Sequence, residues 1–394
     1  MIWKTKSTIS NLFGLIMGVI LLSATTAIYV TAKGEVDNAI PFIHQDTDKL
    51  NNLKDVSKSV LNYDLKKHCA TDLAKMPNTP TEFLTYFNCG HVSQFKNGTV
   101  LREFSLIVRE DKNVSLTMGN PATKTKAITY NAWTFNGTVP GPTMRMTEGD
   151  LVKIKVINQG KIPHSLHMHS IHPGAVDGTM FSNASGAIKP GESFTYQFTA
   201  APSGLWPYHC HMMPLSLHVT KGLYGAMIID PVKPKEKAVE MIGIMNGFDL
   251  GLNNATELPR LPTYEEAQQI MSGNDTAENA LPQERDNHIY ALNTVAFYYD
   301  VHPIQLKVNT PYRFYLVNML DFDFANQFHI HGNVFKYYPS GIGENPMMVN
   351  DIVTLGQGDR GILEFKYTLP GLYMIHSHFE SQSGRGWEGL LSVK

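Results

Sequence analysis

Ten of the 16 histidines lie in four short motifs, one of which also contains a cysteine. The motifs are His164-Ser-Leu-His167-Met-His169, His209-Cys210-His211 with His218 beyond it, His329-Ile-His331 and His376-Ser-His378. Because side chains alternate along a strand with a period of two, each His-x-His pair directs both imidazoles to one face. The residue between them faces the other way. Cys210 and its flanking histidines should therefore serve two different metal sites that one covalent segment connects.

The cysteine indicates which metal the first site prefers. Cys210 can combine with His164 and His218, and two imidazoles with one thiolate and a weak axial position are typical of blue copper. Zinc also accepts imidazole and thiolate ligands, but zinc could not use the adjoining eight histidines for electron transfer. The nearby methionines, at positions 168, 212 and 213, are expected to pack around the site rather than to bind copper(I).

Two stretches with alternating apolar and polar residues must position these motifs. Runs such as LVKIKVIN in residues 99–231 and PYRFYLVNML in residues 237–394 are separated by Gly, Pro and Asp turns, which predicts a β-sandwich in each stretch. Both stretches have the same order of strand runs and histidine motifs, so they are expected to be duplicated domains. A polar segment of about residues 253–285, with the helical pattern PTYEEAQQIM, interrupts the second stretch.

The first 32 residues have the pattern of an export segment. Lys4 and Lys6 precede an apolar run from Leu12 to Val30, which is long enough for a membrane anchor, while its small residues also permit cleavage as a signal peptide. With the lysines inside, both alternatives place the remainder outside the cytoplasm, either secreted or held at the outer face of the membrane. Six Asn-x-Ser/Thr sequons agree with export.

Residues 33–98 form an N-terminal extension ahead of the two β-rich stretches. Apolar residues recur every three to four positions over about residues 46–67, which predicts an amphipathic helix. The chain has three cysteines, and in an oxidising compartment we expect Cys69 and Cys89 to form a disulfide. Cys210 would then be left without a disulfide partner, which agrees with its assignment as a metal ligand.

Composition excludes two broad classes of protein. Hydrophobic residues make up 43% of the 394 residues, with 31 Gly and 22 Pro, which favours a globular chain with many turns over a disordered one. The 33 Lys and Arg against 35 Asp and Glu give a net charge of −2. No broad basic face for nucleic acid is expected.

The four motifs resemble those of the multicopper oxidases, and in particular the two-domain, laccase-like kind with blue copper in the first domain. The resemblance covers about residues 99–394 and implies two cupredoxin-like Greek-key β-sandwich domains. It also implies type 1 copper at His164, Cys210 and His218, and type 2 copper at His167 and His329. The binuclear type 3 pair would be held by His169, His209, His211, His331, His376 and His378.

Two features depart from the family pattern. Six residues, 212–217, separate the His-Cys-His motif from His218, which is more than the family usually has, and we expect a longer loop there. The axial position, five residues beyond His218, holds Leu223 instead of methionine. Leucine cannot coordinate, so a three-coordinate copper with a raised reduction potential is expected.

The resemblance implies an oxidoreductase that oxidises a donor one electron at a time and reduces dioxygen to water. Asp177, Asp323 and Glu380 are candidates for a proton relay. The main alternative is a copper nitrite reductase, which has the same fold; the segment GQGDRGILEF (residues 356–365) is similar to archaeal proteins named so. Where that enzyme has its catalytic aspartate this chain has His167, which favours the oxidase. A non-catalytic copper-binding protein of the cell surface is the third alternative, and the electron donor could be a small reductant or a cupredoxin.

The oligomeric state can be predicted from how the cluster histidines are divided between the two domains. Each domain brings four of the eight cluster histidines, and a chain with two domains lacks the spacer that would let the halves meet internally. A closed homotrimer, in which each first domain meets a neighbour's second domain, would pair every half.

Overall fold

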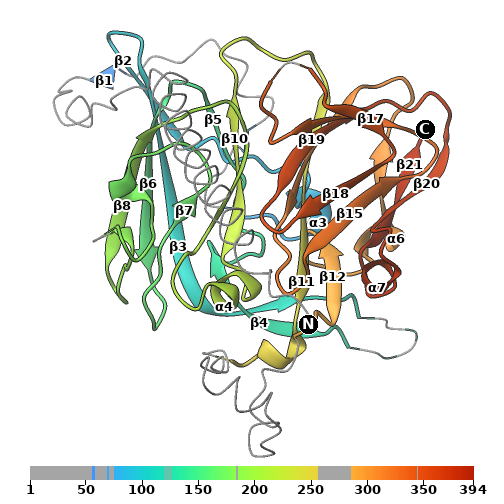
Figure 1. The fold of residues 1–394 in the computed structure, drawn as a ribbon, viewed down its shortest axis with the longest axis horizontal. Coiled ribbons are helices and arrows are strands. Elements are labelled where there is room, and N and C mark those ends of the chain that lie inside the picture. The colour runs from blue at the N-terminus through green and yellow to red at the C-terminus, as the bar shows by residue number, and fades with distance from the viewer. Residues whose placement is uncertain are drawn as a thin grey trace, which may run out of the picture. The chain divides into compact units, whose positions relative to one another are not determined.

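The computed structural model describes residues 56–57, 69–70, 75–119, 122, 124, 126–182, 185–255, 285–343 and 345–394, which belong to one unit, Asn52–Lys394. Strands dominate this part of the chain (Figure 1), so the expected all-β fold is confirmed. The export segment and the helical pattern PTYEEAQQIM lie outside the described residues. None of the helices in the described ranges has the length and apolar character needed to cross a membrane.

Two sheets form the first β-sandwich. One sheet contains β1 (Val56–Ser57), β2 (His91–Phe95), β3 (Val100–Ser115), β6 (Leu151–Asn158) and β8 (Ser193–Thr199), with β4 (Thr129–Phe135) paired to β3. The other contains β5 (Met144–Thr147), β10 (Tyr224–Asp230), β9 (Gly204–His209) and β7 (His167–Met168). Along β6, Val152, Ile154 and Val156 are buried because they face the core between the sheets.

The second β-sandwich has the same two-layer construction. Its first sheet contains β12 (Ile289–Leu292), β11 (Val239–Phe248), β14 (Tyr312–Asn318), β19 (Arg360–Phe365), β16 (Phe335–Pro339) and β17 (Met348–Asn350). Its second sheet contains β13 (His302–Leu306), β21 (Glu388–Val393), β20 (Gly371–His376), β15 (Ala325–Ile330) and β18 (Ile352–Gly356). The histidine motifs of both domains therefore lie at strand ends.

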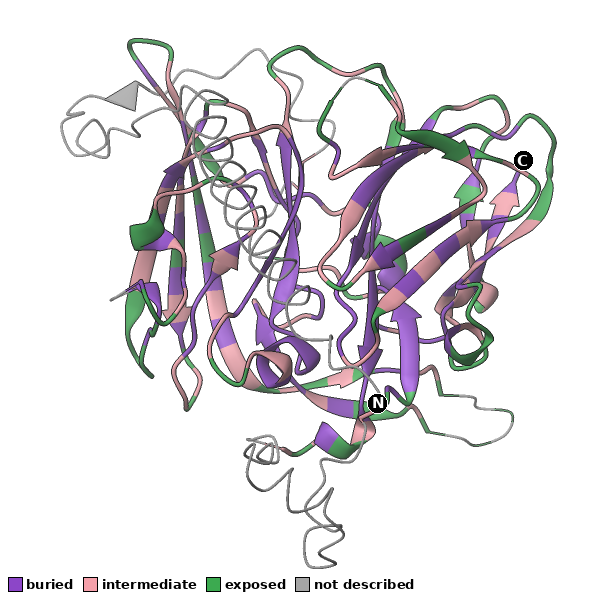
Figure 2. Cartoon of the chain, in the orientation of Figure 1, coloured by how far each residue is buried: buried purple, intermediate pink, exposed green. Residues whose placement is uncertain are grey.

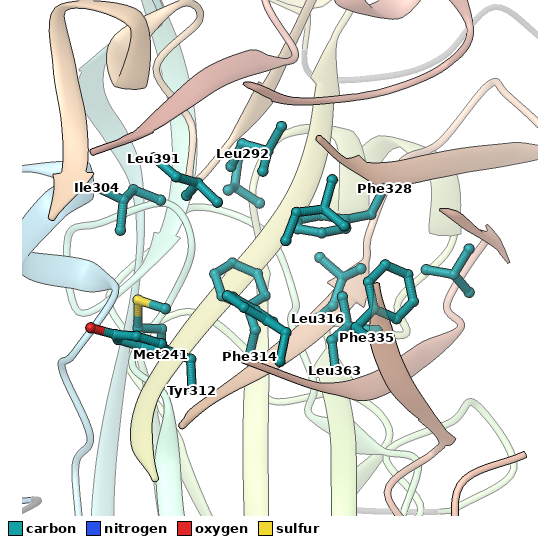
Figure 3. Packing of buried hydrophobic residues seen from close by; sticks show 14 of the residues in the cluster. Met241, Leu292, Ile304, Tyr312, Phe314, Leu316, Phe328, Phe335, Leu363 and Leu391 are labelled. Atoms are coloured by element: carbon teal, nitrogen blue, oxygen red, sulfur yellow. The ribbon is translucent and has the colours of Figure 1, made fainter. Parts of the chain in front are cut away.

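Three apolar cores hold the sandwiches together. One lies inside each domain, and Figure 3 shows that of the second domain, with Phe314 and Leu316 of β14 pointing into it. The third core contains residues of both domains, among them Ile228 of β10 and Tyr315 of β14. Strand β14 is thus buried on both faces, which explains why its sequence is almost continuously apolar. Its neighbour β11 is buried in the same way and is purple over most of its length in Figure 2.

A buried ion-pair network also connects the domains. Arg145 of β5 contacts Glu240 of β11 at 2.7 Å, and Arg313 of β14 contacts the same carboxylate at 3.1 Å. All three side chains are at most 11% exposed. A charged group that is buried this deeply needs its partners, because an unpaired buried charge is strongly destabilising.

Short helices interrupt the strands, and two segments of the chain differ from what the sequence predicts. The helices are α3 (Pro80–Phe83), α4 (Leu215–Thr220), α6 (Tyr298–Val301), α7 (Glu380–Ser383) and the 3-10 turns η2 (Gly174–Val176) and η4 (Leu250–Leu252). The helix expected over residues 46–67 is wrong at Val56–Ser57, which form strand β1 paired with β2; its other residues lie outside the described ranges. The long loop expected before His218 is instead partly helical, because α4 carries that histidine.

The cysteines pair as expected. Cys69 and Cys89 form a disulfide with their Cα atoms 5.6 Å apart, and Cys210 is a buried free thiol.

Candidate metal centres

Three buried side chains of the first domain meet at a point suited to a metal. Cys210 directly follows β9, and His218 lies on α4. His164 lies in the chain segment after β6, where it forms an isolated β-bridge with Ile188. The Cys210 Sγ atom lies 3.2 Å from His218 Nδ1 and 3.7 Å from His164 Nδ1, and these side chains are at most 1% exposed. This two-imidazole, one-thiolate set is the one that blue copper prefers.

The surroundings favour the charged thiolate. Burial alone would raise the pKa of the Cys210 thiol, but His218 and His164 outweigh burial and hold the pKa well below its usual range. The backbone amide of Ser165 also donates a hydrogen bond to Sγ over 3.4 Å. A buried anion between two imidazole nitrogens is a site that a metal cation would stabilise.

Two neighbours of this site were not found from the sequence. Glu110 of β3 lies with Oε1 2.9 Å from His164 Nε2, and the edge-on ring of Trp133 in β4 packs against both His164 and His218 at 5.6 and 4.9 Å. No local spacing indicates either contact, because Glu110 is 54 residues away from His164 in the sequence. Together they fix the ring orientations of the two imidazoles.

Leu223 and two of the three nearby methionines lie in or against the apolar core around Cys210. Leu223 is fully buried in the same core as Cys210, and its carbonyl accepts the Cys210 amide over 2.9 Å. Met168 is buried in that core and Met212 packs against it. Met213 differs, because it is 62% exposed and so does not pack around the site.

Four histidines of the first domain gather on the opposite side of the Cys210 segment. His167 of β7 pairs in register with His209 of β9, and the rings of His169 and His211 lie 5.2 and 5.1 Å from that of His167. The Nε2 atoms of His169 and His209 are 3.1 Å apart. We call these four residues the first-domain cluster.

The second domain repeats this geometry. His329 of β15 pairs in register with His376 of β20, and the Nε2 atoms of His331 and His376 are 3.0 Å apart. The ring of His378 lies 5.5 Å from that of His329. These four residues form the second-domain cluster, in which His331 and His378 are exposed.

Matching hydrogen bonds orient the imidazoles in both clusters. The Nδ1 atom of His167 lies 2.8 Å from the carbonyl oxygen of Asp177, and that of His329 lies 2.9 Å from the carbonyl oxygen of Asp351. Nδ1 of His209 and of His376 likewise face the carbonyl of the next residue, at 2.9 and 2.7 Å. With Nδ1 anchored, Nε2 is the atom left for a metal.

Burial favours the neutral form of two histidines in the first-domain cluster. It lowers the pKa of His209 to about 4 and that of His169 to about 3, and the neighbouring imidazoles push both values in the same direction. Neutral imidazole is the form that binds metal ions. These two imidazoles are therefore prepared to act as ligands at neutral pH.

The three candidate relay carboxylates have different surroundings. Asp177 lies with Oδ1 3.2 Å from His167 Nδ1. Asp323 instead accepts hydrogen bonds from Asn287 and Tyr290, at 2.7 and 3.0 Å, and Glu380 opens helix α7. Of the three, only Asp177 contacts a candidate ligand among the described residues.

A pocket of about 520 Å³ opens beside the first-domain cluster. Its lining includes His167, His169, Asp177 and two residues that the sequence motifs did not indicate, His172 and Arg360. His172 Nε2 lies 3.6 Å from Asp177 Oδ1.

The two clusters do not meet within the chain as described. Every ring contact among the eight cluster histidines joins residues of one domain, in the ranges that the structure describes. The groups of possible ligands found there also fall within single domains.

Comparisons with known proteins agree with this donor set. Two family models, both described as multicopper oxidase, match residues 117–234 and 259–392. The chain is 34% identical to a multicopper oxidase of known crystal structure, with a TM-score of 0.68 over 80% of this chain and 97% of that one. A blue copper oxidase from Nitrosomonas europaea is 26% identical, with a TM-score of 0.60 over 75% and 86% of the two chains.

A sequence relative carries a different name. The copper-containing nitrite reductase of Neisseria meningitidis is 27% identical over 64% of this chain. The match spans 61% of that enzyme's length. The two family models and the multicopper oxidase crystal structure together show that this chain belongs to the multicopper oxidase family, whose members are copper-dependent oxidoreductases.

Proposed function

We propose that this chain oxidises an electron donor at a blue copper and reduces dioxygen to water at a trinuclear copper cluster. The observation that carries the proposal is the His209-Cys210-His211 segment. The Cys210 sulfur is directed to His164 and His218, whereas His209 Nε2 is directed to His169. Two sites of different chemistry are thus linked through one backbone segment.

Copper supplies one-electron chemistry at the first site and the multi-electron reduction of a small oxidant at the cluster. The protein's part is to hold the ligands, to exclude competing reactions and to deliver protons. Asp177 orients His167 and lines the pocket, so we propose it as the proton donor in preference to Asp323 and Glu380. The donor of electrons would be a small reductant or a cupredoxin.

The paired nitrogens suggest how the histidines divide. The His169 and His209 pair and the His331 and His376 pair would each hold one type 3 copper. His211 and His378 would each supply the third ligand, across the junction of the two clusters. His167 and His329 would share the type 2 copper, because each stands in the corresponding place of its own cluster.

We further propose a closed homotrimer in which one subunit's first-domain cluster meets the next subunit's second-domain cluster. The support is that the two clusters do not contact each other within the described part of the chain and that His331 and His378 of the second-domain cluster are solvent-exposed. Exposed Phe379, next to His378, adds apolar surface there. A heterologous contact repeated around a three-fold axis leaves no cluster unpaired.

We also propose that the protein works outside the cytoplasm, secreted or anchored to the outer face of the membrane. The apolar N-terminal segment and the Cys69 to Cys89 disulfide support this location. Fractionation of cells that express the full chain tests it, and recovery of the protein in the cytoplasmic fraction would contradict it.

Nitrite reduction is the second candidate, because relatives that are 27% and 25% identical to this chain are named copper nitrite reductases. The ligand count argues against it, since eight clustered histidines exceed the needs of a mononuclear site. A non-catalytic copper carrier would have no use for a cysteine that links two sites.

One experiment separates the candidates. The copper-loaded protein is supplied with one common reductant and either dioxygen or nitrite, and consumption of both is followed. The proposal expects dioxygen consumption at many turnovers per chain and little nitrite loss. Faster nitrite loss would support the reductase, and no copper-dependent turnover would support the carrier.

A further inference from the structure

Arg360 belongs to the second domain, yet it lines the pocket beside the first-domain cluster of the same chain. It is the first residue of β19 and follows a tight turn from β18. None of the four histidine motifs includes it.

A glycine turn brings this segment close to the histidines. The Asp359 amide donates to the Gly356 carbonyl over 3.0 Å, and Gly358 has a φ of +73°, a conformation that favours glycine. A Cβ atom at Gly358 would lie 3.6 Å from His169 Cε1. The turn therefore lies so close to a candidate copper ligand that a side chain at position 358 would touch its ring.

The guanidinium of Arg360 is held in place by the strand that leads to His209. Its Nε donates to the Leu205 carbonyl over 3.1 Å, and its central carbon lies 4.6 Å above the Trp206 ring. Both partners are in β9. Among the described residues, its terminal amino groups have no hydrogen-bond acceptor and no carboxylate within ion-pair distance.

The carboxylate in the pocket lining, Asp177, and the carboxylate next to Arg360 in the sequence, Asp359, are already engaged. The Asp177 carboxylate lies against His167 and His172, at 3.2 and 3.6 Å. The carboxylate of Asp359 accepts the backbone amide of Arg360 over 2.8 Å. Arg360 thus brings a permanent positive charge and unused donors to the pocket wall.

We propose that Arg360 makes this pocket a binding site for small monovalent anions, nitrite and azide among them, next to the copper cluster. A planar guanidinium with free donors recognises such ions by charge-assisted hydrogen bonds. Dioxygen is neutral and would gain nothing from it. The inference rests on the proposed function, because the anion is placed beside copper held by His167 and His169.

The test is the affinity of the copper-loaded protein for azide, followed by the charge-transfer absorption of copper-bound azide. Arg360→Gln should weaken azide binding about tenfold, the effect expected for one charge-assisted hydrogen bond. Arg360→Lys should weaken it less, because the charge remains. Lys155→Gln removes a charge from an exposed position on β6 and should change the affinity less than twofold.

The KM for dioxygen separates anion selection from general damage. The proposal expects the KM for dioxygen to stay within about twofold in Arg360→Gln, while the inhibition constant of nitrite against dioxygen consumption rises with the azide dissociation constant. Equal loss of azide and dioxygen affinity, or unchanged azide affinity in a variant with full copper content, would overturn the inference.

The wild-type protein offers a second test if Arg360→Gln does not fold. Azide affinity should fall as ionic strength rises from about 0.01 M to about 0.15 M, because the screening length shortens from about 30 Å to about 8 Å. Salt-independent azide binding without competition from chloride would contradict the role of the charge. Copper content per chain, measured on the same samples, shows separately whether the trinuclear cluster itself exists.

Discussion

Replacing Glu110 with glutamine should raise the reduction potential of the blue copper. Glu110 Oε1 lies 2.9 Å from His164 Nε2, and Cys210 Sγ lies 3.7 Å from the other nitrogen of that ring. The carboxylate is 9% exposed. An anion so close to the ligand set stabilises the oxidised, more positive copper, and Glu110→Gln removes that anion while its amide oxygen can still accept a hydrogen bond.

The size of the effect can be estimated from Coulomb's law. For unit charges about 7 Å apart, as on Glu110 and a copper held by the far nitrogen of His164, an effective dielectric constant of about 20 gives an interaction of roughly 2.4 kcal/mol. For a one-electron couple, in which about 59 mV corresponds to about 1.4 kcal/mol, the potential should rise by roughly 100 mV.

The assay is a redox titration followed by the intense visible band. Glu103→Gln is the matched control, because Glu103 is an exposed glutamate on the same strand, β3. In this variant the reduction potential of the blue copper should stay within about 15 mV of the wild type. A Glu110→Gln variant with an intact visible spectrum and an unchanged or lowered potential would refute the electrostatic reasoning.

Three further perturbations test other parts of the account. Cys210→Ser should abolish the visible band and stop turnover while the histidine clusters still bind copper, so a variant that keeps its colour would exclude this thiolate as the chromophore. Leu223→Met should lower the potential by adding a weak axial ligand, and an unchanged potential would mean that the residue does not face the copper. Glu240→Gln should destabilise the fold by about 3 kcal/mol, since it breaks a buried pair. Burial alone would raise the pKa of Glu240, but Arg145 outweighs burial and lowers the pKa to about 2. The stability that Glu240 contributes is therefore present at neutral pH and is lost as the pH falls toward that value. The free energy of unfolding, measured with denaturant, should differ less between pH 7 and pH 3 in the variant than in the wild type.

The sequence was sufficient to predict what depends on strand periodicity. Alternation along β9 and the residues after it separates His209 and His211 from Cys210, and the same rule pairs His329 with His331. The two-domain fold follows from repeated β-rich stretches. These features are local, so a single sequence contains them.

Features that depend on long-range contacts could not be predicted. Glu110 of β3 contacts His164, which lies beyond the end of the neighbouring strand β6, and Arg360 reaches the first-domain pocket from the second domain. Helix α4 replaced an expected loop, because the short run after Pro214 gave no clear helical period. The strand at Val56 was missed for a different reason, since its apolar spacing matched a helix while pairing with β2 determined the outcome.

Copper analysis of the fully loaded protein tests the central claim most directly. One blue site and a trinuclear cluster require about four coppers per chain, of which one gives the blue spectrum. We expect about four coppers per chain, one of them blue, in a particle whose mass is that of a trimer. About two coppers per chain would contradict the trinuclear cluster and would favour the nitrite reductase arrangement.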